Sequence, residues 1–318
     1  MIDRPDVDAL MAGELGRWLE GQEQVRAEAK KKTWNRRFIV LIILLPLALF
    51  VLIAFQVDFA PVAWGGAVLG AAGFAWAQRP VTKAVKTVKV GINEAIAGTL
   101  GLEYRHDCDP GMPFELAKSC RLLPKYDRAS FEDHWSGHIG DIPFSLHEVK
   151  LEEKRGSGKN RRWVTVFRGI IMSVGYSRRF HGTTLLVRDN AFRHFYGAKK
   201  DTIEVIGKRL DYAEMTHPDF EDKFDIFTTD QTEARHLIDP LYVERLIAVE
   251  QSYRGDDVTT IFHEGNLVVT LKAGNMFESG HIEARHDRRR METTVDQFAR
   301  IADLARELNS REPVTGQR

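Results

Sequence analysis

The chain has 318 residues, and its 45 Lys and Arg balance its 45 Asp and Glu, so the formal net charge is zero. This length accommodates one large or two modest domains, and the neutral balance gives no indication of a nucleic-acid partner. Cys108 and Cys120 are the only cysteines. They are too few for a disulfide framework, and their spacing fits neither a redox pair nor a zinc knuckle. We therefore expect reduced thiols in a cytoplasmic setting.

Residues 1–37 form a predicted cytoplasmic, amphipathic N-terminal segment. Its helical pattern covers residues 6–32, and its thin apolar stripe consists of Val7, Met11, Leu15 and Trp18. The segment ends in basic residues, and such residues neutralise anionic headgroups when they lie near a membrane surface. We expect it to lie on the membrane, to dock on the main domain or to fray.

The first apolar run, Phe38 to Phe55, contains no charge and predicts a transmembrane helix over residues 38–57. Its apolar side chains together favour insertion by several kcal/mol. Pro46 lies in the middle of the run and is expected to kink the helix. A signal peptide is not expected, because more than thirty charged and amphipathic residues precede the run.

The second run, residues 61–77, is weaker and predicts a transmembrane helix over residues 60–78. Trp64 and Trp76 lie near its two ends, as interfacial aromatic residues do. Gly66 and Gly70 form a GxxxG pattern, which permits close contact between helices. The contact is either a dimerisation face or, as we prefer, packing against the first helix of the same chain.

Basic residues decide the predicted topology. Lys and Arg flank both runs on their outer sides, whereas the link from Gln56 to Ala60 has none. The positive-inside rule therefore places both termini in the cytoplasm of a multi-pass bacterial inner-membrane protein. The stretch FQVDFAPV is then an external turn that carries Asp58. In the alternative, the second run fails to cross, and the large domain lies outside.

Residues 79–100 predict a basic juxtamembrane helix that continues the second span. Its apolar positions have helical spacing: Val81, Val85, Val88, Ile92 and Ile96. Its basic residues mark another face of the helix: Lys83, Lys86 and Lys89.

Residues 101–290 predict an α+β cytoplasmic domain with antiparallel hairpins and inserted helices. A short helix is expected within 113–123, a hairpin within 137–154, and strands within 161–177 and 183–189. The buried side of the first hairpin is expected to consist of Ile142, Phe144, Leu146 and Val149.

Further along, a strand within 223–230 is expected to enter a helix through a capping box from Asp230 to Glu233. A second helix begins after Asp239, with Pro240 at its first position. A hairpin within 258–273 turns at His263 to Asn266. Residues 291–318 form a C-terminal helix, near 293–309, and a tail. The helix has one apolar side: Val295, Phe298, Ala302 and Ala305.

Several of these segments resemble a bacterial membrane family, domain-of-unknown-function family 3137. The longest is HPDFEDKFDIFTTDQTEARHLIDPLYVERL at 217–246; shorter ones are Glu132-Asp133 with Gly137, Glu148, VFRG at 166–169, Phe180-His-Gly-Thr-Thr, Asn266 and MFE at 276–278. The resemblance covers roughly residues 100–280 and the preceding membrane hairpin. It implies a membrane-attached cytoplasmic domain and brings no established reaction or ligand.

The usual catalytic and nucleotide-binding signatures, GxxxxGK[ST], GxSxG and HExxH, do not occur. The loop RGSGKNRR at 155–162 is expected to be a solvated hairpin loop. Its rival interpretation is an anion or phospholipid-headgroup site built from Lys159, Arg161 and Arg162.

We expect no metal and no cofactor. EDHWSGH, residues 132–138, holds two histidines four apart, His134 and His138, but Ser136 and Gly137 disfavour the helix that would join them. HIEARH places His281 and His286 five apart, off a common helical face. The charge run that follows is interpreted as solvated or headgroup-facing.

Four carboxylates are possible acids or bases: Glu115, Glu148, Glu221 and Asp222. The sequence shows no pair of them around one substrate, so Asp222 is interpreted as surface charge and Glu148 as a buried, hydrogen-bonded structural carboxylate. The neighbouring apolar residues are expected to be core: Phe220, Phe224, Ile226 and Phe227.

Two functional hypotheses follow. The first is a non-catalytic binding or scaffold domain held near the lipid surface, with anionic headgroups, a protein partner or a second copy as its ligand. The alternative is a membrane-tethered enzyme, for instance a hydrolase, with Asp133, Glu148 or His138 gathered in one cleft. A transporter is disfavoured because the predicted spans carry no ionisable residue.

Overall fold

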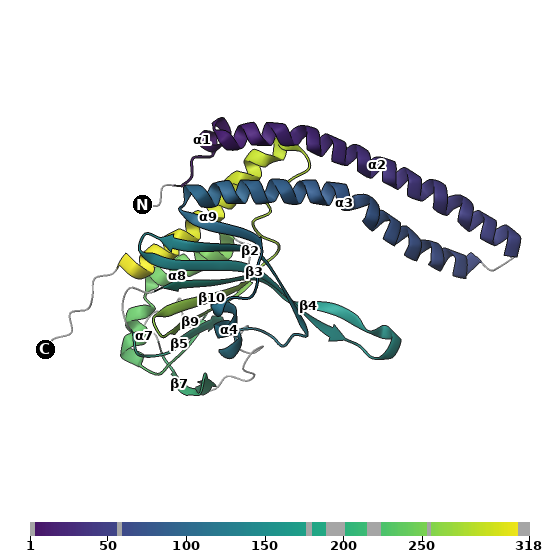
Figure 1. The fold of residues 1–318 in the computed structure, drawn as a ribbon. Helices are drawn as coiled ribbons and strands as arrows, with labels where there is room; N and C mark the ends of the chain where they lie inside the picture. The colour runs from purple at the N-terminus through teal and green to yellow at the C-terminus, as the bar shows by residue number, and fades with distance from the viewer. Residues whose placement is uncertain are drawn as a thin grey trace. The chain divides into compact units, whose positions relative to one another are not determined.

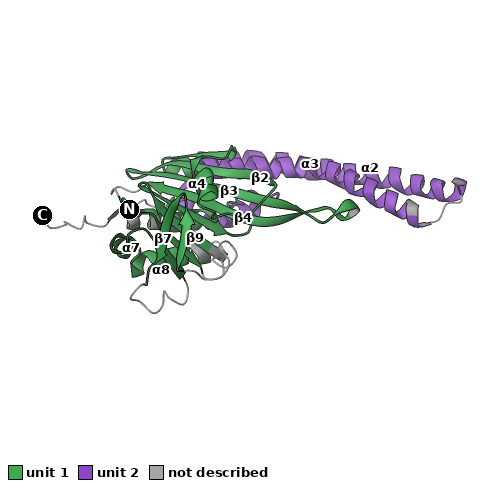
Figure 2. Cartoon of the chain, turned by 90° about the horizontal axis from the view of Figure 1, so that it is seen from below, with its two compact units in different colours: residues 1–5, 96–277, 293–318 green, residues 6–95, 278–292 purple. Residues whose placement is uncertain are grey.

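The computed structural model describes residues 4–55, 59–175, 180–188, 201–214, 224–252 and 256–310. The chain forms two compact units (Figure 2). The helical unit comprises residues 6–95 and 278–292, and the sheet unit comprises residues 1–5, 96–277 and 293–318.

Three helices make most of the helical unit: α1 (Val7–Ala12), α2 (Glu14–Phe55) and α3 (Phe59–Thr99). The expected N-terminal helix and the first apolar run are thus one continuous helix, α2, which contains Pro46 in its interior. The second run and the predicted juxtamembrane helix are likewise one helix, α3. The predicted turn at residues 56–58 lies outside the described residues.

Helices α2 and α3 lie side by side (Figure 1) and approach closely at two of the α3 glycines, Gly73 and Gly91. A Cβ on Gly73 would lie 2.8 Å from Val40 Cγ1, and a Cβ on Gly91 would collide with the Trp18 ring. The preferred interpretation, packing within one chain, therefore has a geometric basis. The close approach is at Gly73, however, because a Cβ on Gly66 would meet nothing within 4 Å.

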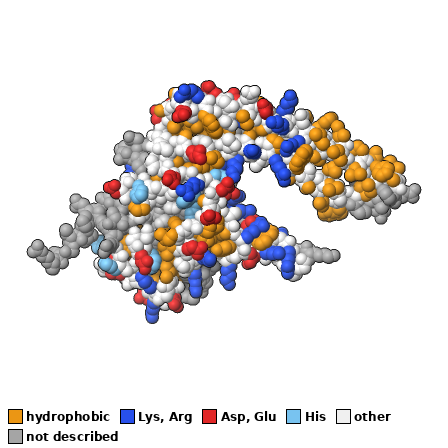
Figure 3. Space-filling model, in the orientation of Figure 1, with side chains coloured by type: hydrophobic (Ala, Val, Ile, Leu, Met, Phe, Trp, Pro, Cys, Tyr) orange, Lys and Arg blue, Asp and Glu red, His pale blue; other side chains and the backbone are white. Residues whose placement is uncertain are grey.

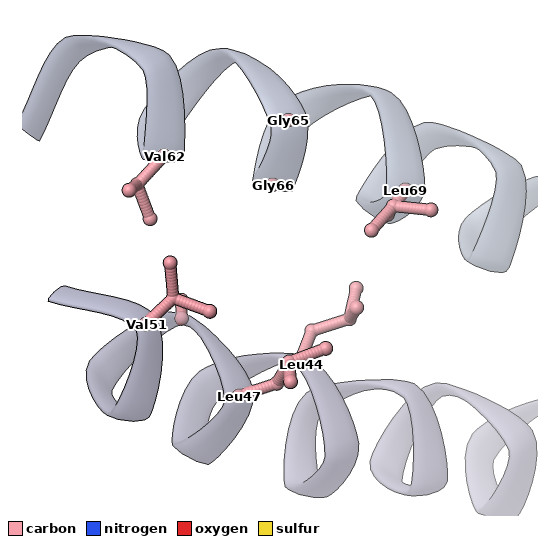
Figure 4. Close-up of a pocket in the computed structure, with 8 residues that line it drawn as sticks. Leu44, Leu47, Val51, Val62, Gly65, Gly66 and Leu69 are labelled. Carbon is pink, nitrogen blue, oxygen red and sulfur yellow. The ribbon is translucent and has the colours of Figure 1, made fainter. Parts of the chain in front are cut away.

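Toward the C-terminal end of α2, an apolar cavity of about 350 Å³ separates the two helices (Figure 4). Val51 on α2 and Val62 on α3 point toward one another across it, and Gly65 and Gly66 line the α3 side. Gly66 of the predicted GxxxG pattern therefore faces a cavity.

Among the described helices, one is long and apolar enough to cross a membrane by length and composition, the segment Glu14–Ala54 of α2, and none of its most apolar stretch is buried. Its large side chains are exposed; Leu45 is 66% exposed and Ile53 is 69% exposed. The expectation of an apolar N-terminal helix is confirmed. A second crossing by α3 stays a prediction.

A connector, residues 278–286, runs along the cytoplasmic end predicted for α3. Lys89, which the sequence places on a basic face of α3, is only 4% exposed, and its Nζ lies 2.7 Å from Glu278 Oε1. Ser279 donates a hydrogen bond to Asn93 Oδ1 at 2.7 Å, and both side chains are fully buried. The counter-charge of Lys89 comes from a segment 189 residues away, which the helical pattern does not reveal.

The described strands of the sheet unit form a ten-stranded sheet whose ladders are antiparallel, in the order β1-β2-β3-β4-β10-β9-β5-β8-β7-β6. The strands are β1 (Leu102–Asp107), β2 (Arg128–Ile139), β3 (Ile142–Arg155), β4 (Arg162–Gly175), β5 (Thr184–Arg188), β6 (Thr202–Val205), β7 (Lys208–Tyr212), β8 (Phe224–Thr228), β9 (Asp256–His263) and β10 (Asn266–Lys272). The helices are α4 (Met112–Ser119), α7 (Gln231–Leu237), α8 (Pro240–Ser252) and α9 (Asp287–Ser310), with short 3₁₀ turns η1 (Gly158–Asn160) and η2 (Ala284–His286). The predicted α+β class is confirmed.

Both faces of the central strands are buried, so strands such as β5 and β8 read as continuous apolar runs rather than alternating ones. Helix α4 contributes Phe114 and Cys120 to a core cluster that includes Val149 and Ile171. On the α9 side, the Phe298 ring lies 4.9 Å from Trp135 and 5.5 Å from Phe144. The predicted apolar side of the last helix is buried as expected, although α9 begins at Asp287, earlier than predicted.

The predicted cap at Asp230 is confirmed in part. Asp230 Oδ1 accepts hydrogen bonds from the backbone N–H groups of Thr232 and Glu233. Glu233 does not return to Asp230, as a capping box requires, but accepts from the backbone N–H groups of His181 and Gly182 at 2.9 and 2.7 Å. It therefore fastens the segment before β5 to the start of α7.

Candidate functional site: a basic hollow beside the β3–β4 arm

The hairpin of β3 and β4 extends beyond its neighbours in the sheet. Its last pair with β2 joins Glu152 to Arg128, and its last pair with β10 joins Gly169 to Lys272. Residues 153–164, the arm, therefore pair only with each other. Figure 1 shows the arm projecting from the sheet. A two-stranded ribbon is marginally stable by itself, so its base needs support from side chains.

Glu152 supplies that support at the base of the arm. Its carboxylate accepts from Arg128 Nε at 2.7 Å and lies 2.9 Å from Lys150 Nζ. These hydrogen bonds lower the pKa of Glu152 to about 2. The Arg128 guanidinium also stacks on the Trp163 ring at 4.0 Å, which ties β2 to the arm.

A basic hollow of about 840 Å³ opens between the arm and the end of α4. It is lined by Lys118, Arg121, Leu123, Pro124, Lys125, Glu153, Arg155, Thr165 and Val166. Four cations and one carboxylate give this lining a formal charge of +3. Figure 3 shows Lys and Arg side chains gathered along the arm and at its base. The only lining carboxylate, Glu153, already lies 2.6 Å from Arg155 Nε.

Arg121 occupies a backbone conformation that usually calls for glycine. Its φ is +56°, just beyond α4, and the next residue, Leu122, donates its N–H to Ala117 O at 2.9 Å. Helices that end in this way generally carry glycine at the left-handed position. An arginine there costs about 1 kcal/mol or more in strain, and such costs concentrate at functional positions. For stability alone, glycine would therefore be more favourable than arginine at position 121.

The lining fits an anionic ligand that also has apolar surface. Arg and Lys side chains bind phosphate and carboxylate oxygens through charge-assisted hydrogen bonds. Leu123, Pro124 and Val166 supply an apolar wall beside them. The hollow has room for a phosphorylated headgroup or a small phosphate ester.

Among the described side chains of the predicted anion loop, only Arg155 lines this hollow. Arg161 and Arg162 lie exposed elsewhere on the arm, and the Lys159 side chain is outside the described set. The main cations come from α4 and the turn after it, which the sequence interpretation missed. Their spacing, Lys118, Arg121 and Lys125, was a usable signal, since it places three cations around one helix end.

The residues of the enzyme hypothesis do not gather in a hollow. Asp133 is fully buried at a β-bulge, where Tyr104 donates to its Oδ1 at 2.5 Å. Glu148 is buried and accepts from Met276 N at 3.1 Å, as a structural carboxylate does, whereas His138 is exposed. None of the three lines the basic hollow. Glu115 is exposed on α4, and Glu221 and Asp222 lie outside the described residues, as does Phe220.

The predicted core residues Phe224, Ile226 and Phe227 are buried. His134 and His138 belong to strand β2, so side chains four residues apart lie about 13 Å from each other, which is too far for one ion. His134 Nε2 lies 3.0 Å from Ser145 Oγ instead.

Both cysteines are free thiols. Burial raises the pKa of Cys120 to about 12, and burial together with Asp133 raises the pKa of Cys108 to about 11. They are therefore weak nucleophiles at neutral pH.

The fold defines an α+β protein with a large antiparallel sheet and one long apolar helix. Residues 165–310 match the family model described as Protein of unknown function (DUF3137), so this part of the chain is a domain of that family. The predicted resemblance to this family is thereby confirmed over residues 165–280, whereas its extension to residues 100–164 and to the membrane hairpin stays a prediction. The matched range includes Thr165 and Val166 of the hollow, whereas its cations precede it.

No curated protein matches the chain. Among solved structures, the crystal structure of the mycobacterial trehalose monomycolate transport factor A, TtfA, is similar at 13% identity and a TM-score of 0.31. The comparison covers 70% of this chain and 96% of that one. A likeness at this score carries no argument about the present chain.

Proposed function

We propose that this chain is a bacterial inner-membrane protein with both termini in the cytoplasm, whose sheet unit binds a phosphate-bearing anion in the basic hollow. In this role it is a non-catalytic binding or scaffold protein. The observation that carries the proposal is the +3 lining of the hollow, with Arg121 held in a strained conformation at its edge.

The membrane placement rests on α2 and on the basic flanks. The apolar stretch of α2 is exposed to its surroundings, which in water would be costly and in lipid is favourable. Arg36 and Arg37 at its cytoplasmic end lie over Trp76 and Phe74 of α3, at 4.6 and 4.9 Å from the ring centroids. Such cation–aromatic pairs suit the level of the lipid headgroups, and this supports the proposal that α3 crosses as well.

Reporter fusions test the topology. Fusions after residue 58 should report the periplasm, and fusions after residue 100 should report the cytoplasm. A periplasmic signal after residue 100 would overturn the proposed placement. Labelling of the native thiols is a poor substitute, because Cys120 is fully buried and the pKa of Cys108 is raised to about 11.

Phosphate oxygens reach the hollow from two sources, an anionic phospholipid headgroup or a soluble phosphate compound. The ligand test therefore uses the purified full chain in neutral detergent, with short-chain phosphatidylglycerol, short-chain phosphatidylcholine and inorganic pyrophosphate as separate probes. Binding of phosphatidylglycerol alone assigns the site to lipid, and binding of pyrophosphate assigns it to a soluble anion. If neither binds better than phosphatidylcholine, the proposed function is wrong.

Charge-matched variants separate the hollow from general electrostatics. The triple variant Lys118→Ala/Arg121→Gly/Lys125→Ala removes three cations from the hollow. Near a surface each cation contributes about 1 kcal/mol, so affinity should fall about a hundredfold. The control variant removes three exposed cations elsewhere in the chain, Arg209, Arg235 and Arg300. Equal losses in both triple variants would refute a built site.

Arg121→Gly by itself distinguishes a ligand-binding role from a structural one. Glycine relieves the left-handed strain but loses more entropy on folding, so the stability of the chain should stay within about 1 kcal/mol of the wild type or rise. Anion affinity should nevertheless fall about fivefold or more. A variant that is destabilised by several kcal/mol would show instead that Arg121 holds the fold.

A further inference from the structure

His281, Glu283 and His286 come together in the connector of the helical unit. One ligand atom from each lies within 4.8 Å of the others. The two imidazole rings meet edge to face, with centroids 4.4 Å apart. We propose that these three side chains bind one divalent transition-metal ion of the zinc class. The site is separate from the basic hollow and does not depend on the proposed function.

The local backbone explains why the spacing of the two histidines did not indicate a metal site. The histidines were interpreted as lying off a common helical face, but the segment is a tight turn. His281 Nδ1 lies 3.3 Å from Glu283 O, which accepts its proton when an ion is bound at Nε2. Without an ion, Nδ1 accepts the Glu283 N–H at 3.0 Å, and the His286 N–H donates to Glu283 O at 3.1 Å within η2. These two bonds fold HIEARH back on itself, so ligands five residues apart face one point.

The distances fit a tetrahedral ion after a small contraction. Zinc binds imidazole nitrogen and carboxylate oxygen at about 2.0–2.2 Å, which puts neighbouring ligand atoms about 3.4 Å apart. His286 Nε2 already lies 3.6 Å from Glu283 Oε2. The remaining separations, up to 4.8 Å, close with rotations of partly exposed side chains. Two histidines and one glutamate leave a fourth position open for water.

Two cations compete with the ion for Glu283. Arg285 Nη2 lies 2.7 Å from Oε2, and Lys30 Nζ on α2 lies 3.7 Å from Oε1. The Arg285 side chain is 76% exposed, so its ion pair contributes little and can be released into water. The metal would therefore take the place of Arg285 beside Glu283. This competition gives the proposal its most discriminating test.

Ion pairs and hydrogen bonds already hold the residues on both sides of the three ligands, so the backbone of the site is in place before the ion binds. Asp287, next after η2, forms a buried ion pair with Arg26 of α2 at 2.6 Å. Arg290 donates to the backbone oxygens of Glu278 and Gly280 at 2.7 and 3.0 Å. Ligands held on both sides lose little freedom on binding, which favours affinity.

The test uses the full chain in neutral detergent, stripped with a chelator and titrated with Zn²⁺ by calorimetry. Co²⁺ then serves as an optical probe of the ligand set. We expect one saturable site per chain. His281→Ala and His286→Ala should each weaken binding tenfold or more, and Glu283→Gln should do the same. The exposed histidines His138 and His236 provide the matched controls, and His138→Ala and His236→Ala should leave the affinity unchanged.

Arg285→Ala provides a readout that misfolding does not imitate, because removal of the competing cation should tighten Zn²⁺ binding. Absence of saturable binding would refute the site. Equal weakening by the control variants would refute it too, as would Arg285→Ala binding that is weaker than wild type. Circular dichroism of each variant confirms that the helices persist.

Discussion

His147 makes the sheet unit sensitive to acid. It is 1% exposed on β3, and its Nε2 has no hydrogen-bond partner among the described residues. Its ring lies among Phe131, at 5.9 Å, and His134, at 6.2 Å. Burial, and secondarily His134, lower the pKa of His147 from 6.5 to about 4. The folded protein therefore keeps this imidazole neutral at a pH where the unfolded chain protonates it.

The sign and size of the effect follow from proton linkage. Between pH 6.5 and 4 the unfolded state binds more protons, so the free energy of unfolding falls as pH falls. One pH unit corresponds to about 1.4 kcal/mol, so the whole window removes about 3 kcal/mol. Above pH 6.5 the free energy of unfolding is not reduced by His147. By about pH 4 the full reduction of about 3 kcal/mol is reached. Against a total of about 5–15 kcal/mol for a domain, this is a large share.

The perturbation is His147→Leu, which fills a similar volume and does not titrate. At pH 7 it should change stability by less than about 1.5 kcal/mol, because the lost nitrogen makes no hydrogen bond with the described residues. The pH dependence of stability between 6.5 and 4 should become shallower by about 3 kcal/mol in total. His134, whose pKa is also lowered by burial, leaves some residual slope.

The assay is urea unfolding of the full chain in detergent at several pH values, followed through the reactivity of Cys120. That thiol is fully buried in the core cluster on the same face of the sheet, so it reports opening near His147. A Cys108→Ser background and a disulfide reagent active at acid pH keep the signal specific. His138→Leu, at an exposed position on the neighbouring strand, is the control. If wild type and His147→Leu give parallel stability curves from pH 7 to 4, the reasoning fails.

Two further predictions concern the connector. Gly280→Ala should destabilise the helical unit by about 1–3 kcal/mol, because the new Cβ would lie 2.7 Å from Lys89 N and collide with Val85 O, both backbone atoms of α3. Gly274→Ala, where a Cβ meets nothing within 4 Å, should stay within about 0.5 kcal/mol, and equal thermal shifts for the two variants would contradict the packing. Arg26→Leu should lower the free energy of unfolding by about 3–5 kcal/mol, because the buried Asp287 carboxylate loses its counter-charge. The double variant Arg26→Leu/Asp287→Leu should recover most of that stability in urea unfolding. A double variant as unstable as the single one would contradict this prediction.

Elements built from local patterns were predictable. The helix over 38–55, the hairpin that turns at Glu264 and Gly265, and the cap at Asp239 all follow from periodicity, turn chemistry and capping within a few residues. Antiparallel pairing within the hairpins also followed, because a hairpin dictates it, whereas the ladders β4–β10 and β5–β9 join distant segments. The family resemblance was recognisable for the same reason, since its longest segment is continuous in sequence.

Arrangements that need distant segments were not predictable. Glu233 does not complete the predicted capping box, because its carboxylate accepts hydrogen bonds from two backbone N–H groups before β5. These groups lie about fifty residues away in sequence. Lys89 is buried beside Glu278, which forms an ion pair with it from 189 residues along the chain. The basic hollow likewise joins α4 to an arm that follows it by thirty residues or more.

By itself, the sequence determined where this chain is apolar, where it turns and which hairpins form, because each of these properties depends on neighbours along the chain. Only the tertiary structure decided which charges meet: the cations around the hollow, the pair of Arg26 with Asp287, and the turn that gathers two histidines and a glutamate. The physical reason is that electrostatic contact requires a few ångströms in space. Residue spacing fixes such distances within a regular helix or strand, but not across a turn or between segments far apart in the chain.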